Sequence, residues 1–286
     1  MPDPIDPSKT IIFKETDWQD VLFRTGVSHN HNVNISGGSE TATFNASAGY
    51  MTNDGTVITT HYDRLTFNLG GEVKIRPNLK VGGRASYSKY TNNGINETSI
   101  FARAIGQAPT TKYTFEDGTL APGNRGAGNP AYHLHKNTSK NSDENITFIF
   151  DANWEIIPGL TFTPTFSIWK ESEDKYSFTP SYLDGVNRLN TVRPASASYS
   201  NWWQTQADAV LSYNKDFKDH HLNVMAGYSY YFKSSYGMSA SGEGALTDLI
   251  PTLNAVSKYT HMSSNLSKQI MLGYFGRINY NYKQRY

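Results

Sequence analysis

Cysteine is absent from the 286-residue chain, and no apolar run is long enough for a membrane-spanning helix. The lack of thiols excludes disulfide bonds and thiolate metal sites. The lack of apolar runs of about 18 residues predicts no transmembrane helix. An excess of one charge is also lacking, since 26 Lys and Arg residues stand against 25 Asp and Glu residues. This balance gives no reason to expect a nucleic-acid partner.

The N-terminus lacks the features of a secretory signal peptide. Residues 1–7 are polar and rich in proline, with neither a basic start nor an apolar centre. We therefore interpret the chain as an internal segment of a longer gene product, with residues 1–30 as an irregular lead-in.

The dominant pattern in the chain is an alternation of apolar and polar residues with a period of two. In residues 62–75, for example, Leu65, Phe67 and Leu69 share one face, and polar residues occupy the positions between them. A β-strand separates the two kinds of residue cleanly, whereas a helix would mix them. The pattern predicts nine strands, over residues 31–37, 40–52, 62–75, 78–91, 144–157, 159–171, 201–215, 219–233 and 268–282.

Short and long connections alternate between these strands. The short turns are at 37–39, 76–78, 157–159 and 216–219, and the longer segments are 53–61, 92–143, 172–200 and 234–267. If successive strands pair antiparallel, all short turns fall at one end of the sheet and all long loops at the other. Several strands also exceed the usual length of about five or six residues in soluble proteins, and they suffice to cross a membrane. The fold class predicted is all-β, an antiparallel transmembrane barrel with short periplasmic turns and long extracellular loops.

The two faces of the predicted strands have different roles in this interpretation. The apolar face, which includes Leu69 and Phe148, is expected to contact lipid, and aromatic residues near strand ends are expected to form interfacial girdles. Charges of both signs on the other face suit a polar interior. Nine strands cannot close as a single-chain bacterial barrel, and an open edge cannot stand in lipid. We expect residues 31–286 to be part of a larger barrel.

Four segments resemble one known family. They are Thr-Asp-Trp-Gln-Asp-Val-Leu-Phe-Arg at 16–24, Asn-Val-Asn-Ile-Ser-Gly-Gly-Ser-Glu at 32–40, Ala-Ser-Ala-Gly-Tyr at 46–50 with Asp54-Gly55, and Tyr-Phe-Gly-Arg-Ile-Asn-Tyr-Asn-Tyr at 274–282. They resemble the barrel of SusC/RagA-type TonB-dependent transporters of the bacterial outer membrane. The resemblance is specific at 16–90 and 268–283, and between these ranges it depends on pattern and loop length.

The resemblance implies a 22-stranded barrel with an N-terminal plug that imports oligosaccharides or peptides. It also implies energy from the inner-membrane TonB complex and a SusD-like lipoprotein that covers the loops. The sequence shows no plug, no TonB-contacting segment and fewer strands than that barrel. Any function of this kind is therefore expected to belong to a longer parent chain.

No arrangement of residues suggests catalysis, so we predict neither an enzyme nor a cofactor. A third metal ligand is not evident beside any of the paired histidines, so we predict no metal site and interpret these pairs as polar loop or interface residues. The pairs are His29 and His31, His133 and His135, and His220 and His221.

The substrate itself is not predicted by the sequence, and only weak candidates for contact with it emerge. Trp202 and Trp203 lie where a long loop is expected to re-enter the barrel, and indole rings stack on the C–H faces of sugars. A place in the membrane girdle is the alternative for both. Ligand and lid contacts are expected in the long loops. Two other hypotheses stay open: a different outer-membrane barrel, such as a porin or adhesin, and a soluble all-β binding module.

Overall fold

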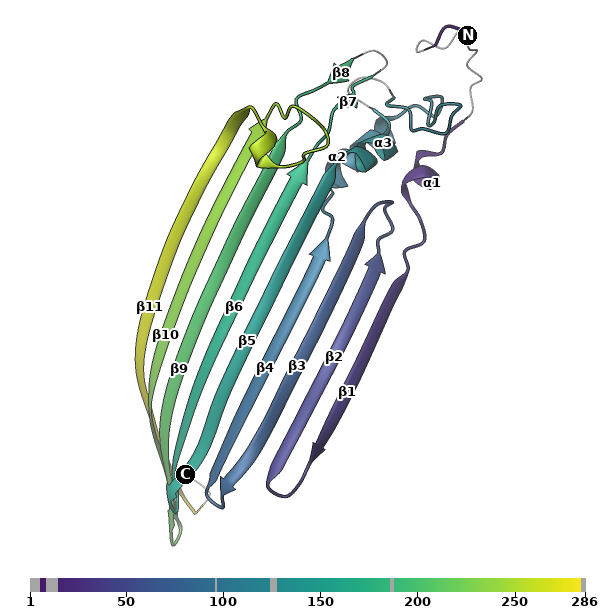
Figure 1. The fold of residues 1–286 in the computed structure, drawn as a ribbon. Coiled ribbons are helices and arrows are strands. Elements are labelled where there is room, and N and C mark those ends of the chain that lie inside the picture. Colours follow the sequence, from purple (N-terminus) through teal and green to yellow (C-terminus); the bar gives the residue numbers. More distant parts are fainter. Residues whose placement is uncertain (1–5, 9–14, 96, 124–127, 186–187, 284–286) are drawn as a thin grey trace.

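The computed structural model describes all residues except 1–5, 9–14, 96, 124–127, 186–187 and 284–286. Its described residues contain one antiparallel sheet of nine strands, in the order β1-β2-β3-β4-β5-β6-β9-β10-β11. Figure 1 shows these strands side by side in a single curved layer that does not close on itself. The strands are β1 (Ser28–Gly38), β2 (Ala42–Asp54), β3 (His61–Arg76), β4 (Leu79–Asn92), β5 (Thr138–Ile157), β6 (Leu160–Phe178), β9 (Ala195–Phe217), β10 (His220–Glu243) and β11 (Lys258–Tyr282).

Smaller elements occupy one end of the sheet. They are the helices α1 (Trp18–Leu22), α2 (Glu97–Gly106) and α3 (Pro130–Lys136), the 3-10 turn η1 (Leu253–Ala255), and a hairpin of β7 (Tyr182–Leu183) and β8 (Leu189–Asn190). None of the described helices is long and apolar enough to cross a membrane.

The register of the sheet separates apolar from polar side chains. Leu69 of β3, Ala85 of β4, Phe148 of β5 and Ile168 of β6 are consecutive cross-strand partners, so their side chains lie on one face. We call this the outer face and the opposite side the inner face. The row displaced by one residue, which includes Thr147, lies on the inner face.

Large apolar side chains on the outer face are exposed to an unusual extent. Phe148 is 52% exposed and Leu69 is 61% exposed, although both lie near the middle of their strands. A contiguous surface of this kind would be costly in water, whereas lipid accepts it. We call this surface the apolar band. Its members include Phe67, Leu69, Phe148, Phe150, Phe166, Leu211, Ile270, Leu272 and Ile278.

The short connections all lie at one end of the sheet and the long connections at the other, as predicted (Figure 1). In the turn between β5 and β6, Gly159 adopts φ 86°, a conformation that side chains disfavour. The carboxylate of Glu155 accepts a hydrogen bond from the backbone N–H of Gly159 at 2.9 Å. The predicted fold class, an antiparallel barrel segment, is therefore confirmed.

Several strands run further toward the long-loop end than the alternation predicts. The prediction begins β9 at residue 201 and ends β10 at residue 233, but β9 begins at Ala195 and β10 continues to Glu243. Beyond the apolar band the alternation continues with smaller residues, as in Ala195, Ala197 and Tyr199 on the outer face of β9 with serines between them, so its signal weakens while the backbone ladder continues. The connections are correspondingly shorter than expected, at 93–137, 179–194 and 244–257.

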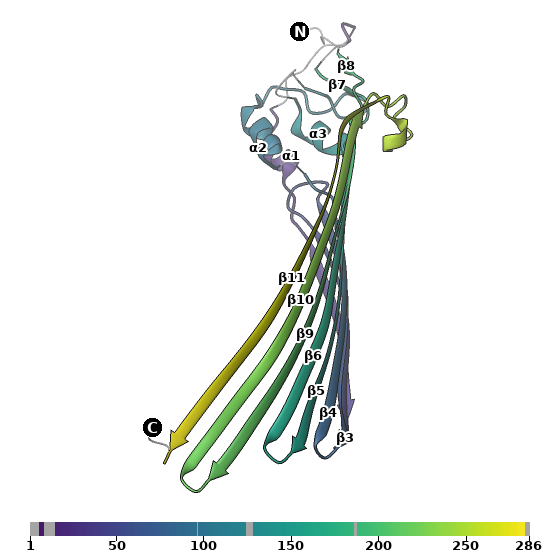
Figure 2. The ribbon, with the colours of Figure 1, turned by 90° about the vertical axis from the view of Figure 1, so that its left-hand side faces the viewer.

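Two small cores lie at the long-loop end, on opposite sides of the sheet. Figure 2 shows the three helices on one side and η1 on the other. The helical core contains Leu22, Val57, Ile100 and Leu134. On the outer face, the loop that carries η1 packs onto the ends of β6 and β9 through a core of Phe178, Ala195, Ala245 and Val256.

The two faces predict opposite effects for the same substitution. Phe148→Asp places a charge in the apolar band, at a cost of about 2 kcal/mol or more, and should prevent assembly in the outer membrane. Thr147→Asp places the charge on the inner face and should assemble normally. Heat-modifiable migration of outer-membrane fractions measures the folded yield of both variants. Normal assembly of the Phe148→Asp variant would show that the faces are reversed.

Candidate functional site at the loop end of the sheet

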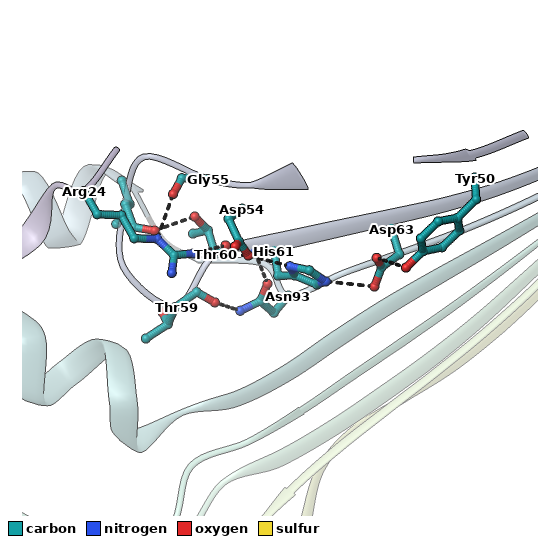
Figure 3. A network of polar contacts seen from close by, with 10 residues as sticks. Arg24, Tyr50, Asp54, Gly55, Thr59, Thr60, His61, Asp63 and Asn93 are labelled. Atoms are coloured by element: carbon teal, nitrogen blue, oxygen red, sulfur yellow. Dashed lines mark hydrogen bonds and ion pairs between the residues drawn. The ribbon is translucent and has the colours of Figure 1, made fainter. Parts of the chain in front are cut away.

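A network of polar contacts ties the segment before β1 to the ends of β2, β3 and β4 (Figure 3). Arg24 donates to the backbone carbonyls of Gly55 at 3.1 Å and Thr60 at 3.0 Å. Asp54, at 3.5 Å from the Arg24 guanidinium, also contacts a ring nitrogen of His61 at 2.8 Å.

The same network continues in two directions from His61. Its other ring nitrogen lies 2.9 Å from Asp63, which accepts a hydrogen bond from the Tyr50 hydroxyl at 3.0 Å. The backbone N–H of His61 donates to the side chain of Asn93 at 2.7 Å, and Asn93 in turn donates to the carbonyl of Thr59. Thr59 and Asn93 are thereby fixed as parts of the wall of a cavity.

Helix α3 forms another wall, and its start has a clear chemical cause. The side chain of Asn129, which is fully buried, accepts from the backbone N–H of Ala131 at 3.0 Å, and Pro130 occupies the first turn. The same side chain donates to the carbonyls of Tyr113 and Ala121 at 2.9 and 2.8 Å. One residue therefore caps the helix and holds the preceding loop against it.

The cavity has a volume of about 790 Å³ and lies between the helices and the strand ends. Its lining combines three connecting segments, 55–60, 93–137 and 179–194, with the adjoining strand ends. Representative residues are Thr59, Asn93, Arg103, His133, Lys136, Tyr182 and Asn190.

Basic side chains gather in this lining. The Arg103 guanidinium lies 3.1 Å from Nε2 of His133. Arginine can only donate, so His133 accepts at Nε2 and is neutral in this contact. The ammonium group of Lys136 lies over the ring of Tyr182, 3.3 Å from its centroid, in a cation–π contact.

Burial and mutual repulsion lower the proton affinity of these groups. Burial, followed by the charges of Lys136 and Arg103, lowers the pKa of His133 to about 3. Burial and the charge of Arg103 lower the pKa of Lys136 to about 8, against an opposing influence of Asp184. The cavity thus combines hydrogen-bond donors, aromatic surface and positive charge. Such a lining can hold polar ligands and favours groups with negative charge or strong acceptors.

A second contact at this end fixes the loop that carries η1. Arg193 donates to the carboxylate of Asp248 at 2.6 Å, and the backbone N–H of Ser181 donates to the same oxygen at 2.7 Å. The Ser181 hydroxyl donates to the other carboxylate oxygen at 2.5 Å. These hydrogen bonds lower the pKa of Asp248 to about 2. They join the connection 179–194 to the connection 244–257.

The two tryptophans that the sequence singled out do not line this cavity. Both lie within β9, where Trp203 pairs with Lys170 and Ser234 on the outer face. Its indole N–H donates to Thr205 at 3.0 Å. Trp202 is the next residue along the strand and faces the inner side. A single ligand therefore cannot contact both, because consecutive strand residues point to opposite faces.

The histidine pairs remain separate in space. No group of three or more His, Cys, Asp or Glu side chains that could hold a metal ion occurs among the described residues. His29 and His31 stack on the outer face of β1, with ring centroids 6.4 Å apart. Sequence reasoning did not identify Arg103, Lys136 or Tyr182 as site residues. The sequence signal that was available is Asn129-Pro130, an N-cap followed by proline, which indicates a helix start within the expected loop.

The fold and its two faces define the class of protein as an outer-membrane β-barrel, of which this chain forms a segment. The amino-acid sequence is similar to those of known outer-membrane receptors. The chain is 28% identical over 284 residues to TonB-dependent receptor P3 of Formosa agariphila, a match that covers 95% of this chain and 28% of the receptor. It is 25% identical over 305 residues to TonB-dependent receptor SusC of Bacteroides thetaiotaomicron, with 95% of this chain and 29% of the receptor covered. No family model matches the chain.

Solved structures agree in fold. The RagAB peptide importer in its closed-closed state superimposes with a TM-score of 0.81 at 17% identity, over 95% of this chain and 32% of the importer chain. The resemblance to SusC/RagA-type TonB-dependent receptors and the location in the outer membrane are thereby confirmed. These relatives are receptors and transporters rather than enzymes. The chain spans less than a third of the length of either receptor.

The electrostatics of the cavity predict an unusual titration of His133. Its pKa of about 3 lies below the ordinary value of 6.5, so the folded state binds fewer protons than the unfolded state between these values. Stability is therefore full above about pH 6.5 and decreases as the pH falls toward 3. NMR titration should find a neutral His133 at pH 5, and Lys136→Gln should raise its pKa by removing a neighbouring cation. An ordinary pKa near 6.5 in the unmodified protein would contradict the geometry described here.

The Asp248 contact predicts a local effect. Asp248→Asn should ease opening of the loop by about 1 kcal/mol, a small value because the carboxylate is more than one-third exposed. Chymotrypsin should then cut after Leu246 or Leu249, which are 86% and 87% exposed, about fivefold faster. In the unmodified protein, the backbone amides of this loop should lose protection from hydrogen exchange as the pH falls from about 4 to 2, where Asp248 becomes protonated. Asp219→Asn, in a turn at the other end, serves as the control, and equal cutting of both variants would contradict this role.

Proposed function

We propose that this chain forms part of the barrel wall of a TonB-dependent importer that takes up oligosaccharides or peptides. The observation that carries the proposal is the nine-stranded sheet with an apolar outer face and a polar inner face, together with similarity to TonB-dependent receptors over 95% of the chain. In this proposal, residues 1–30 lead into the barrel and residues 31–286 form part of its wall.

The proposal includes a SusD-like lipoprotein over the long-loop end and the TonB complex as the source of energy. The loop end supports a role in docking because it is built from helices with their own core rather than from short turns. Contacts with TonB would be made by parts of the receptor other than this stretch of barrel.

The loop-end cavity is the proposed place of first contact with cargo inside this segment. Its donors and the Tyr182 ring suit the carbonyl, hydroxyl and carboxylate groups of peptides or oligosaccharides. Trp202 is a further candidate for cargo contact, because it faces the inner side. Trp203, on the outer face, is instead proposed to lie in the interfacial girdle.

Uptake by living cells tests the proposal. The gene is deleted and restored in its bacterium, and uptake of fluorescent oligosaccharides and peptides is measured with and without an uncoupler of the proton gradient. Restored cells should take up one of these classes, and the uncoupler should abolish the gain because TonB depends on that gradient. Uptake that persists with the uncoupler would indicate a passive pore and contradict the proposal.

A matched pair of variants then tests the cavity within the same assay. Lys136→Gln removes a cavity cation and should reduce uptake severalfold, whereas Lys218→Gln, in the turn between β9 and β10, should leave it unchanged. Equal uptake by both variants, with transport itself intact, would remove the cavity from the cargo path.

A further inference from the structure

Between the apolar band and the long-loop end of the sheet, a region we call above the band, the two faces carry different charged side chains. On the outer face of β4, β5, β6, β9, β10 and β11, the charged residues above the band form one set. They are Lys89, Lys140, Lys170, Lys268, Glu144 and Asp174. Four cations against two carboxylates leave an excess of two positive charges. The inner face at this height carries three carboxylates, Asp143, Glu171 and Glu173, against two lysines, Lys175 and Lys233, so the excess of positive charge belongs to the outer face.

We name the four lysines the outer basic rim. Within the described residues, only Lys89 of this rim makes an ion pair, with Glu144 at 2.5 Å. Lys170 and Lys268 lie on one cross-strand row, through Trp203 of β9 and Ser234 of β10. That row directly follows Ile168 of β6 and Ile270 of β11, and apolar residues such as Leu266 continue beyond it. Two lysines thus mark the level at which charge first appears on the outer face above the band.

A groove of about 430 Å³ lies on the same face, next to the rim. Its charged part comprises Lys89, Lys140, Lys175 and Asp174, so cations outnumber carboxylates. Its less polar part comprises Tyr176, Tyr199, Met238 and Leu253. Leu253 belongs to η1, and the Asp248 contact with Arg193 holds that loop on the sheet. The loop that carries η1 therefore forms one side of the groove, and the lining of the groove has a cationic part and an apolar part.

The position of rim and groove restricts what can occupy them. Exposed aromatic residues accompany the lysines, since Trp203 is 38% exposed and Tyr236 is 41% exposed. Aromatic rings beside lysines, at the upper limit of an apolar band, are typical of the level at which lipid headgroups lie. A phosphorylated headgroup complements the excess of lysine, and its adjoining carbon chains complement Met238 and Leu253.

We propose that the outer basic rim and this groove bind the phosphorylated headgroup of an outer-leaflet lipid. The lysines contact the phosphate oxygens, and the apolar lining covers the part of the lipid next to the headgroup. This site lies on the face opposite to the polar interior, so it is independent of the cargo path and of the transport proposed above.

The test compares two double variants with the same loss of charge on opposite faces. Lys140→Gln with Lys170→Gln removes half of the outer basic rim. Arg64→Gln with Lys233→Gln removes two cations from the inner face at similar heights, and neither residue lines the groove. Both are made in the full-length receptor, and heat-modifiable migration first confirms that each is folded.

Native mass spectrometry then counts lipids retained after addition of phosphatidylglycerol, phosphatidylcholine or inorganic phosphate. The unmodified receptor should retain phosphatidylglycerol over phosphatidylcholine by about tenfold, and the outer variant should lose most of this preference. The inner variant should keep it. Three results would overturn the proposal: no preference in the unmodified receptor, equal loss in both variants, or displacement of the lipid by an equal concentration of inorganic phosphate.

Discussion

The pairing of backbone polar groups in lipid is the constraint on which the rest of this structure depends. Within a bilayer, an N–H or C=O group without a partner costs several kcal/mol, so strands must be paired along their whole membrane-spanning length. The seven central strands of the sheet meet this requirement because each pairs with a neighbouring strand on both sides. The edge strands β1 and β11 have one partner each among the described residues. Both still carry apolar outer residues, such as Val33 and Ile270, and we infer that other barrel strands pair with their free edges in the assembled receptor.

Once the ladder is fixed, the period of two determines where chemistry can occur. Every second side chain faces lipid, so charges within the band can lie only on the inner face, as Asp151 and Asp208 do. Above the band this restriction ends, and charge returns to the outer face as lysine. The cavity lies beyond the strands, among the loops that contain the helices. Three zones therefore follow one another toward the long-loop end: the apolar band, the region with charged outer residues, and the cavity.

The strands and their faces could be predicted from the sequence because lipid imposes a strict alternation. Leu69 and Phe148 show this, since their neighbours in sequence are polar and their neighbours across the sheet are apolar. The extension of β9 to Ala195 and of β10 to Glu243 could not be predicted in this way. There the alternating residues are mostly small, as in Ala-Ser-Ala-Ser at 195–198 and Met238-Ser239-Ala240, so the contrast between the two faces is too weak to mark a strand.

The candidate site was harder to predict for a related reason. Arg103, His133 and Tyr182 belong to α2, α3 and β7, in two separate connections, and only the folded loops bring them together. Trp202 and Trp203 were predicted as candidates for substrate contact because they are adjacent aromatic residues at an expected loop boundary. The actual strand passes through them, so one faces inward and the other outward. Local sequence therefore predicts the strands of the barrel well, but it predicts a site formed between distant loops poorly.

Lipid contact along a single strand tests the central claim most directly. Because the chain contains no cysteine, single cysteines can be introduced at each position from 268 to 282 of β11 and labelled with a fluorophore. In vesicles of brominated lipid, quenching should alternate with a period of two and be strongest at even-numbered positions from Ile270 to Tyr280. Quenching that is uniform along the strand, or strongest at the odd-numbered positions, would contradict the assignment of the outer face to lipid.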